Sequence, residues 1–237
     1  MPCTSGTQYD MMGAAYIQKS ETSFYNVYYE RPNVKALLNN LHDKRVLELG
    51  CAGGALTEWL VGQNAHVTSI DISQAMTHYT RRRVGSQAHI ITADISKPLD
   101  FLDASSVDVI VASLVLHYIR DWLPVFREFD RVLVDNGEIV ISTHHPHADW
   151  YWHNRPNYFT TELYEETWTI NGETYPITYY HRPLANMFAV FHESGFYVDA
   201  LREPFPLSQA QSKNPDAYQR LTTRPHFLFI RLKKMAS

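Results

Sequence analysis

Short apolar runs alternate with segments of helical periodicity over most of the chain. The apolar runs predict strands at residues 45–49, 66–70, 89–93, 107–112, 138–143, 196–202 and 226–232. The helical spacing predicts helices at residues 34–41, 56–61, 73–83, 123–134 and 184–193. Strands that alternate with helices of about ten residues form βαβ units, in which a parallel sheet is covered on both faces. The pattern therefore predicts an α/β fold.

The alternation breaks after residue 143, where the chain becomes rich in aromatic residues. Residues 144–182 hold 10 of the 31 aromatic residues, and the dipeptide Asn171-Gly172 among them is typical of a type I′ hairpin turn. A two-residue loop at this dipeptide pairs Ile170 with Glu173, Trp168 with Tyr175, and Tyr164 with Tyr179. We expect a β-hairpin whose aromatic face packs on another surface.

Composition and charge narrow the possible functions. The chain has 237 residues, of which 45% are hydrophobic, a net charge of −4 and a pI near 6.3. This balance argues against a dedicated nucleic-acid binder, which carries a basic excess. No apolar stretch of about 18 residues predicts a membrane span, and the first residues lack the pattern of a signal peptide. The two cysteines, Cys3 and Cys51, exclude a disulfide framework, so we expect reduced thiols and a cytoplasmic protein.

A glycine-rich loop and two aspartates follow successive predicted strands. The loop at residues 50–54 leads into a helix, whose N-terminus offers free N–H groups to a ligand. Asp71 ends the next strand, where it can accept both hydroxyls of an adenosine ribose, and Asp94 with Ile95 ends the third, where they can contact adenine. Ser113 ends the fourth strand at the same edge. One aspartate alone would be more simply a helix cap or turn residue, so the joint pattern carries the interpretation.

The spacing of the glycines decides between two adenosine ligands. A dinucleotide fold needs G-x-G-x-x-G, which residues 50–54 do not fit. Glu48, two residues before the loop, would repel a pyrophosphate but could help to hold a cationic amino-acid tail. S-adenosylmethionine carries such a tail together with ribose and adenine, so the residues favour it over NAD.

These segments resemble the motifs of a known family. The run VLELGCAGGALTEWL resembles motif I of the class I S-adenosylmethionine-dependent methyltransferases, and SIDIS, ITADIS and DVIVASLVLHYIRDW resemble the motifs that follow it. The similarity is strongest to the small-molecule branch that includes the ubiquinone and menaquinone biosynthesis methyltransferases, and it covers residues 34–143. The resemblance implies a three-layer α/β sandwich with a seven-stranded, mostly parallel sheet, in which the last strand, residues 227–232, is antiparallel.

The resemblance also implies cofactor contacts by motif position. Together with Glu48, the expected S-adenosylmethionine site comprises Gly50, Cys51, Ala52, Gly54, Asp71, Ile72, Met76, Asp94, Ile95 and Ser113. Asp71 matches the ribose ligand of the family, and Ile72 and Met76 would flank the adenosine. The middle glycine of the family's motif is Ala52 in this chain, and its methyl group should crowd the loop. S-adenosylhomocysteine would be the product.

Three histidines are the candidate catalytic residues. In methyl transfer the protein mainly aligns the acceptor with the methyl group and excludes water, and a base is needed only for a weak nucleophile. His117 follows the fourth strand, and His144 and His145 follow the fifth, so all three are expected at the ligand edge, with at most one acting as a base. Each could equally be a packing or loop residue. The run at residues 144–147 lacks the ligand spacing of a metal site, so no metal is expected.

Two segments are expected to cover the site within a single domain, residues 1–237. Residues 1–32 form an N-terminal arm whose Tyr9 and Tyr16 would fold over the cofactor. Residues 146–182 form a lid-like insertion over the acceptor, although a core-filling or dimer-forming hairpin is an alternative. Arg182, just after the hairpin, is more simply a solvated arginine than a ligand for an acceptor carboxylate.

The sequence leaves the acceptor open. We expect methylation at oxygen, nitrogen or carbon of a small molecule, which the aromatic insertion suggests is apolar or aromatic, by a monomer or homodimer. The alternatives are a non-catalytic S-adenosylmethionine-binding protein and a methyltransferase that acts on RNA or protein. The acidic charge balance and the absence of an Asn/Asp-Pro-Pro-Tyr segment after the fourth strand disfavour a nucleic-acid acceptor.

Overall fold

The computed structural model describes residues 5–235, so Cys3 lies outside the described residues. The α-helices are α1 (Ser5–Thr22), α2 (Arg31–Lys35), α3 (Ala55–Gly62), α4 (Gln74–Val84), α5 (Trp122–Val132), α6 (Pro146–Trp152), α7 (Leu184–Glu193) and α8 (Pro215–Thr223). The shorter helical turns are η1 (Asn26–Glu30), η2 (Gly85–Gln87), η3 (Leu116–Tyr118) and η4 (Ser208–Ser212). The strands are β1 (Arg45–Leu49), β2 (His66–Asp71), β3 (His89–Thr92), β4 (Val107–Ser113), β5 (Leu133–His144), β6 (Glu162–Ile170), β7 (Glu173–His181), β8 (Phe196–Arg202) and β9 (Phe227–Lys234).

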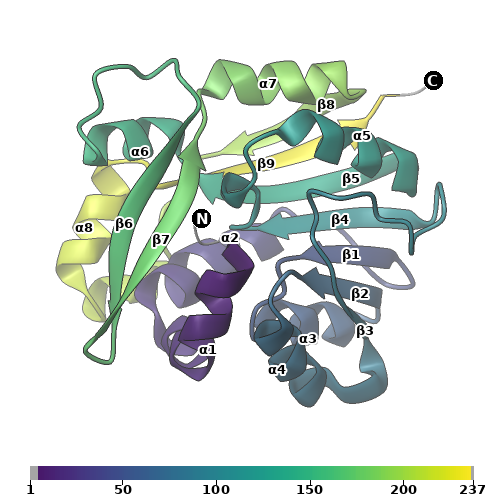
Figure 1. Cartoon of the computed structure of the whole chain (residues 1–237), viewed down its shortest axis with the longest axis horizontal. Helices are drawn as coiled ribbons and strands as arrows, with labels where there is room; N and C mark the ends of the chain where they lie inside the picture. The colour runs from purple at the N-terminus through teal and green to yellow at the C-terminus, as the bar shows by residue number, and fades with distance from the viewer. Residues whose placement is uncertain (1–4, 236–237) are drawn as a thin grey trace.

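Seven of the strands form one sheet in the order β3-β2-β1-β4-β5-β9-β8, which runs across the centre of Figure 1. Strands β1 to β5 are parallel, and β9 enters antiparallel between β5 and β8. The middle strands carry buried apolar runs, residues 109–112 of β4 and 139–141 of β5, because both faces of the sheet are covered there. This arrangement confirms the predicted fold class, including the antiparallel last strand.

Helices cover both faces of the sheet and form its two hydrophobic cores. On one face, α5 and α7 bury Phe126 and Phe191 against the sheet. On the other face, α3 and α8 bury Leu60 and Leu221. The apolar positions of α5 recur at helical spacing, so the whole buried stripe of this helix meets the sheet. None of the helices between residues 5 and 235 has the length and apolar character of a membrane span.

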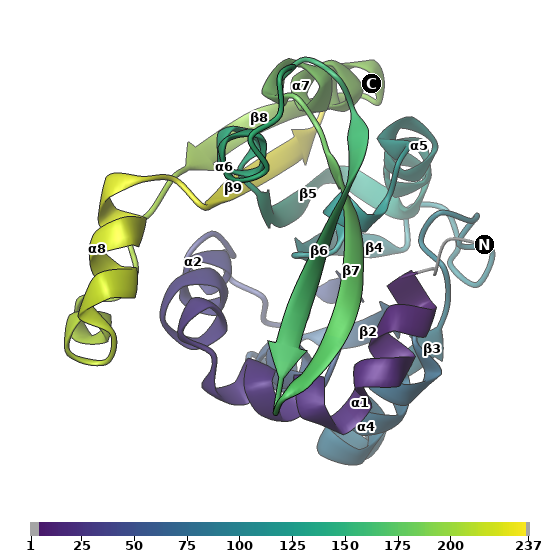
Figure 2. The ribbon, with the colours of Figure 1, turned by 60° about the vertical axis from the view of Figure 1, so that its left-hand side comes forward.

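The predicted hairpin is present with the predicted register. Strands β6 and β7 pair Trp168 with Tyr175 and Tyr164 with Tyr179. Asn171 and Gly172 have φ angles of 53° and 87°, as a type I′ turn requires. The hairpin runs alongside α1 at the ligand edge of the sheet (Figure 2), and its inner face forms a third buried cluster with that helix.

Two predicted helix boundaries are wrong. The helix expected at residues 123–134, with Asn136-Gly137 as its C-terminal cap, ends earlier, at Val132. Asn136, with a φ angle of 62°, lies instead within β5, whose pairing register with β4 is irregular nearby. A positive φ at this position is compatible with a helix cap, but here it occurs at a bulge-type irregularity within a strand.

The helix expected at residues 34–41 is also displaced. It begins at Arg31 and ends at Lys35, because Pro32 suits the first turn of a helix. The later apolar residues Leu37 and Leu41 are still buried, but from turns. The sequence analysis did not find α8, although Asn214 caps it through its side chain and Pro215 starts it.

Candidate active site

A cavity opens at the carboxyl ends of β1 to β4 and collects most of the predicted cofactor residues. Those that line it are Tyr16, Glu48, Gly50, Cys51, Ala52, Asp71, Ile72, Asp94, Ile95 and Ser113. Gly54 and Met76 do not belong to the lining. Gly54 begins α3 with a φ angle of 77°, and a Cβ there would come within 3.0 Å of Thr80, while Met76 is fully buried in α4.

The loop after β1 folds back onto the end of β2. Gly50 has a φ angle of 72°, and a Cβ at this position would lie 2.9 Å from Val115, so only glycine fits without movement. Ala52 occupies the left-handed region with a φ angle of 48°, which is strained for a residue with a side chain. Its N–H donates to Asp71 and its carbonyl accepts from Thr80 at 2.8 Å, so both neighbours hold the strained peptide in place.

Asp71 is the carboxylate around which this loop is arranged. Its Oδ2 accepts from the N–H of Ala52 and its Oδ1 from the N–H of Ser73, each at 2.9 Å. Burial raises the pKa of Asp71 to about 6, although the two backbone donors oppose this shift. Each carboxylate oxygen has a further lone pair, so Asp71 can still accept from a ligand in the cavity.

Glu48 lies deeper in the same wall. Its Oε2 accepts from the hydroxyls of Thr57 and Ser69, both at 2.6 Å, and the side chain is 2% exposed. Burial raises the pKa of Glu48 to about 7. The two hydroxyls fix one oxygen, and the residue still lines the cavity.

The third strand end closes the far side of the cavity. Asp94 accepts the N–H of Ser96 through Oδ1 at 2.8 Å, and Ile95 is buried beside it. Ile72, which follows Asp71, is exposed, and it lies so near α1 that a Cβ at Gly6 would come within 3.3 Å of it. This end of the cavity therefore joins a carboxylate to apolar surface.

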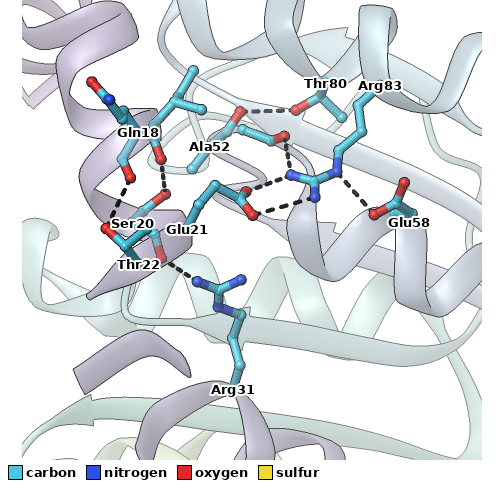
Figure 3. Close-up of polar contacts among 11 residues, drawn as sticks. Gln18, Ser20, Glu21, Thr22, Arg31, Ala52, Glu58, Thr80 and Arg83 are labelled. Atoms are coloured by element: carbon cyan, nitrogen blue, oxygen red, sulfur yellow. Dashed lines mark hydrogen bonds and ion pairs between the residues drawn. The ribbon is translucent and has the colours of Figure 1, made fainter. Parts of the chain in front are cut away.

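Helix α1 covers the cavity and is fixed to the loop beneath it by charges, as Figure 3 shows. Arg83 of α4 pairs with Glu21 of α1 at 2.5 Å and with Glu58 of α3 at 3.0 Å. The same guanidinium donates to the carbonyl of Gly53 in the loop at 3.2 Å. The arm therefore closes over the glycine loop, and its Tyr9 and Tyr16 line the cavity.

Several lining residues were missed by the sequence analysis. They are Ser20, Asn26, Glu30, Arg31, Leu114, Val115, Tyr118 and Ile119. Glu30 is the most unusual of these, because its side chain is 2% exposed and accepts from Ser113 and Ser142. These two partners lie 83 and 112 residues away in the sequence, so no local pattern could have indicated the contact.

The structure brings two of the three candidate histidines together. The rings of His117 and His144 stack with centroids 4.1 Å apart, and His144 Nδ1 lies 3.2 Å from Asp149. Burial lowers the pKa of His117 well below its usual value. Burial is also the largest influence on His144 and opposes its protonation, but the charge and hydrogen bond of Asp149 and the charge of Glu166 together raise its pKa. Neither ring lines the cavity, and His117 contacts it only through the ring of Tyr118.

His145 is separated from this pair by its own contacts. It caps α6 by accepting the N–H of His147 through Nδ1, and its Nε2 lies 2.8 Å from Glu203. Burial lowers its pKa. The arrangement gives His145 a local structural contact at both ring nitrogens.

The hairpin reaches the cavity indirectly. Residues 162–181 are not part of the lining, and their aromatic face packs on α1 and η3. Trp168 stacks on Tyr16 with centroids 6.3 Å apart and planes 11° apart, and Tyr16 in turn lines the cavity. The hairpin thus supports the arm rather than contributing a wall of its own.

Arg182 differs from the sequence-based expectation of a solvated side chain. It is 6% exposed, lies over the ring of Trp122 at 4.6 Å and donates to the carbonyl groups of Ile119 and Arg120. Burial lowers its pKa to about 10. These contacts tie the end of the hairpin to the segment after η3.

Comparisons with known proteins agree with this architecture. Residues 47–141 match the family described as methyltransferase domain. An uncharacterized protein of Haemophilus influenzae is 28% identical over 87% of this chain and 87% of its own length. The ubiquinone biosynthesis O-methyltransferase of Histophilus somni is 32% identical over 44% of this chain, which spans about half, 47%, of that relative. The crystal structure of an S-adenosylmethionine-dependent methyltransferase from Mesorhizobium loti has a TM-score of 0.70 at 22% identity and covers 91% of this chain and 100% of that one.

The family match and the solved structures agree with the glycine loop and the strand-end carboxylates. Residues 47–141 form a methyltransferase domain, and the fold of the chain is that of S-adenosylmethionine-dependent methyltransferases.

Proposed function

We propose that the protein transfers the methyl group of S-adenosylmethionine to a small-molecule acceptor. The observation that carries this proposal is the single cavity in which the glycine loop meets the carboxylates of Asp71 and Asp94. In the proposal, Asp71 accepts the ribose hydroxyls, Asp94 accepts the adenine amino group, and Glu48 faces the ammonium of the methionine tail. Ile72 and Ile95 contact the adenosine.

The covering segments favour a small acceptor. Helix α1 lies over the cavity, and the hairpin holds it there through Trp168 on Tyr16. A polymer such as RNA or a folded protein would have to displace both segments, whereas a small molecule fits beneath them. The apolar and aromatic lining formed by Tyr16, Val115 and Tyr118 suits an aromatic or apolar molecule, and the named relatives include ubiquinone biosynthesis O-methyltransferases.

The contacts of α1 and the hairpin around the cavity also support the proposed domain organisation. Residues 1–32 act as an arm over the cofactor, and residues 146–182 act as a lid-like insertion that holds the arm, within one methyltransferase domain. His117 and His144 remain candidates for acceptor orientation, because they stack behind Tyr118 at the ends of β4 and β5. His145 is the weakest candidate of the three, since Glu203 and the N-terminus of α6 occupy its ring nitrogens.

Calorimetry with S-adenosylhomocysteine and with NAD tests the cofactor assignment. We expect binding of the first and none of the second, and the reverse result would contradict the proposal. A screen of hydroxyl, amine and carbon acceptors, followed by S-adenosylhomocysteine release, tests catalysis. Binding of the cofactor without release on any small molecule, but with release on RNA or protein, would favour the alternative substrates.

A further inference from the structure

Glu30 is a buried carboxylate that the proposed cofactor contacts do not use. It ends η1, its side chain is 2% exposed, and it lines the cavity. The hydroxyls of Ser113 and Ser142 donate to its Oε1 at 2.7 Å and 2.5 Å. Both bonds engage the same oxygen, so they fix the carboxylate and leave Oε2 for another partner.

The charge of Glu30 has no ion pair among residues 5–235. The guanidinium of the adjacent Arg31 donates to the carbonyl of Ser20 instead. Burial raises the pKa of Glu30, and the two serine hydroxyls oppose this shift. The nearby charges of Arg31 and Lys35 oppose it too. A buried carboxylate without a paired cation destabilises a protein, so its presence in a cavity is typical of a group with a binding role.

The position of Glu30 along the sheet indicates which ligand it meets. The sheet order β3-β2-β1-β4-β5 places Asp94, Asp71 and the glycine loop at the ends of three neighbouring strands. Ser113, which ends β4, and Ser142, near the end of β5, hold Glu30 and pair with each other. Neighbouring strands lie about 4.8 Å apart, so Glu30 lies beyond the loop on the side opposite the adenosine contacts.

We propose that Oε2 of Glu30 faces the transferred methyl group and accepts a hydrogen bond from the acceptor, so the acceptor carries a hydroxyl or an amine. This inference rests on the proposed function. It makes Glu30 a specificity-determining residue: a carboxylate at this point favours molecules that present an O–H or N–H to it, and disfavours those that present a carbonyl or a carboxylate.

Sinefungin and S-adenosylhomocysteine separate this role from cofactor binding. Sinefungin carries an amine where S-adenosylmethionine carries the transferred methyl group, whereas S-adenosylhomocysteine carries nothing there. We expect Glu30→Gln to lower the affinity for sinefungin by about tenfold or more, the effect of losing a charge-assisted hydrogen bond. The affinity for S-adenosylhomocysteine should stay within about twofold of the wild-type value. Glu30→Asp should give a smaller loss, again for sinefungin alone.

Controls make each outcome decisive. Asp71→Ala should lower the affinity for both ligands equally. Glu138→Gln changes a buried carboxylate that accepts a hydrogen bond from Asn39, and it should lower the affinity for neither ligand. Equal losses for both ligands in the Glu30 variants would assign Glu30 to the methionine tail and overturn the inference. No loss for either ligand would make Glu30 purely structural and overturn it as well. A wild-type protein that fails to bind S-adenosylhomocysteine would instead contradict the proposed function itself.

Discussion

The cavity lies between two regions that are assembled in different ways. One is the loop wall, residues 48–54, 71–72 and 94–95, and the other is the covering layer, which is formed by α1 and the hairpin, residues 5–22 and 162–181. In the loop wall, the side-chain bonds of Glu48 and Asp71 join residues 2 to 21 positions apart. In the covering layer, Tyr9 bonds Tyr118 across 109 positions and Gln8 bonds Thr178 across 170.

This difference decides what each region can do. The loop wall forms with its βαβ unit, so it is present as soon as the sheet is folded. The covering layer depends on contacts between distant segments, which form late and break independently of the core. We therefore expect changes in the loop wall to act on ligand affinity directly, and changes in the covering layer to act through the position of α1.

The largest effect is expected in the loop wall. Asp71→Ala should weaken S-adenosylhomocysteine binding by about 1–3 kcal/mol, because the ribose hydroxyls and the N–H of Ala52 lose their acceptor. Calorimetry measures the loss. Asp108→Ala is the control, since Asp108 pairs with Arg45 at the start of β1, at the other end of the strands. Unchanged affinity in a folded Asp71 variant would remove the ribose contact from the proposal.

A pH series tests the same carboxylate without a mutation. Burial raises the pKa of Asp71 to about 6, and ribose hydroxyls bind the ionised carboxylate more strongly than the neutral acid, so a bound ligand should lower that pKa. Affinity for S-adenosylhomocysteine should therefore be constant well above pH 6 and fall below it, by up to about tenfold per pH unit.

The matched control for this series is Asp71→Ala. Glu48, whose pKa is about 7, also titrates near this range and remains in the variant. The fall in affinity that is assigned to Asp71 should be absent in the variant. An identical pH profile in both proteins would assign the fall in affinity at low pH to Glu48.

The two regions also differ in how much the sequence predicts. The hairpin register followed from Asn171-Gly172, and the strand ends followed from short apolar runs, because both are set by neighbouring residues. Glu30 could not be found, since its serine partners lie on β4 and β5. The burial of Arg182 was missed for the same reason, because Trp122 lies 60 positions away in the sequence. Ser113 and Ser142 show why such contacts cannot be predicted from the sequence. Neither residue belongs to a local motif, and only the sheet places them side by side.

In the covering layer, Trp168→Ala is expected to have the largest effect. A lid over the acceptor, as the sequence predicts for this segment, would affect acceptor binding alone, but the ring contacts Tyr16, which lines the cavity. An aromatic pair contributes about 0.5–1.5 kcal/mol, so S-adenosylhomocysteine affinity should fall by roughly two- to tenfold. Trp152→Ala, at an exposed ring on α6, should leave it unchanged. Equal behaviour of the two variants would show that the hairpin does not position α1.

A smaller effect is expected from Arg83→Ala, which releases α1 from the glycine loop. The two ion pairs are partly exposed, and such pairs contribute about 0.2–1 kcal/mol each, so affinity should fall by only a few-fold. The loss should shrink as salt is added, because screening already weakens these pairs in the wild type. Arg127→Ala removes a similar exposed pair with Glu193 and should not change affinity. A loss that is independent of salt would contradict the electrostatic account.

The smallest effect concerns the strain in the loop wall. Ala52 has a φ angle of 48°, a conformation that costs a residue with a side chain about 1–2 kcal/mol. Glycine removes that strain but loses about 0.5–1 kcal/mol of backbone entropy. Ala52→Gly should therefore raise the free energy of unfolding by about 0.5 kcal/mol, whereas Ala75→Gly, within α4, should lower it by a similar amount. Denaturant unfolding measures both changes. If both variants are destabilised alike, the loop holds no strain at Ala52.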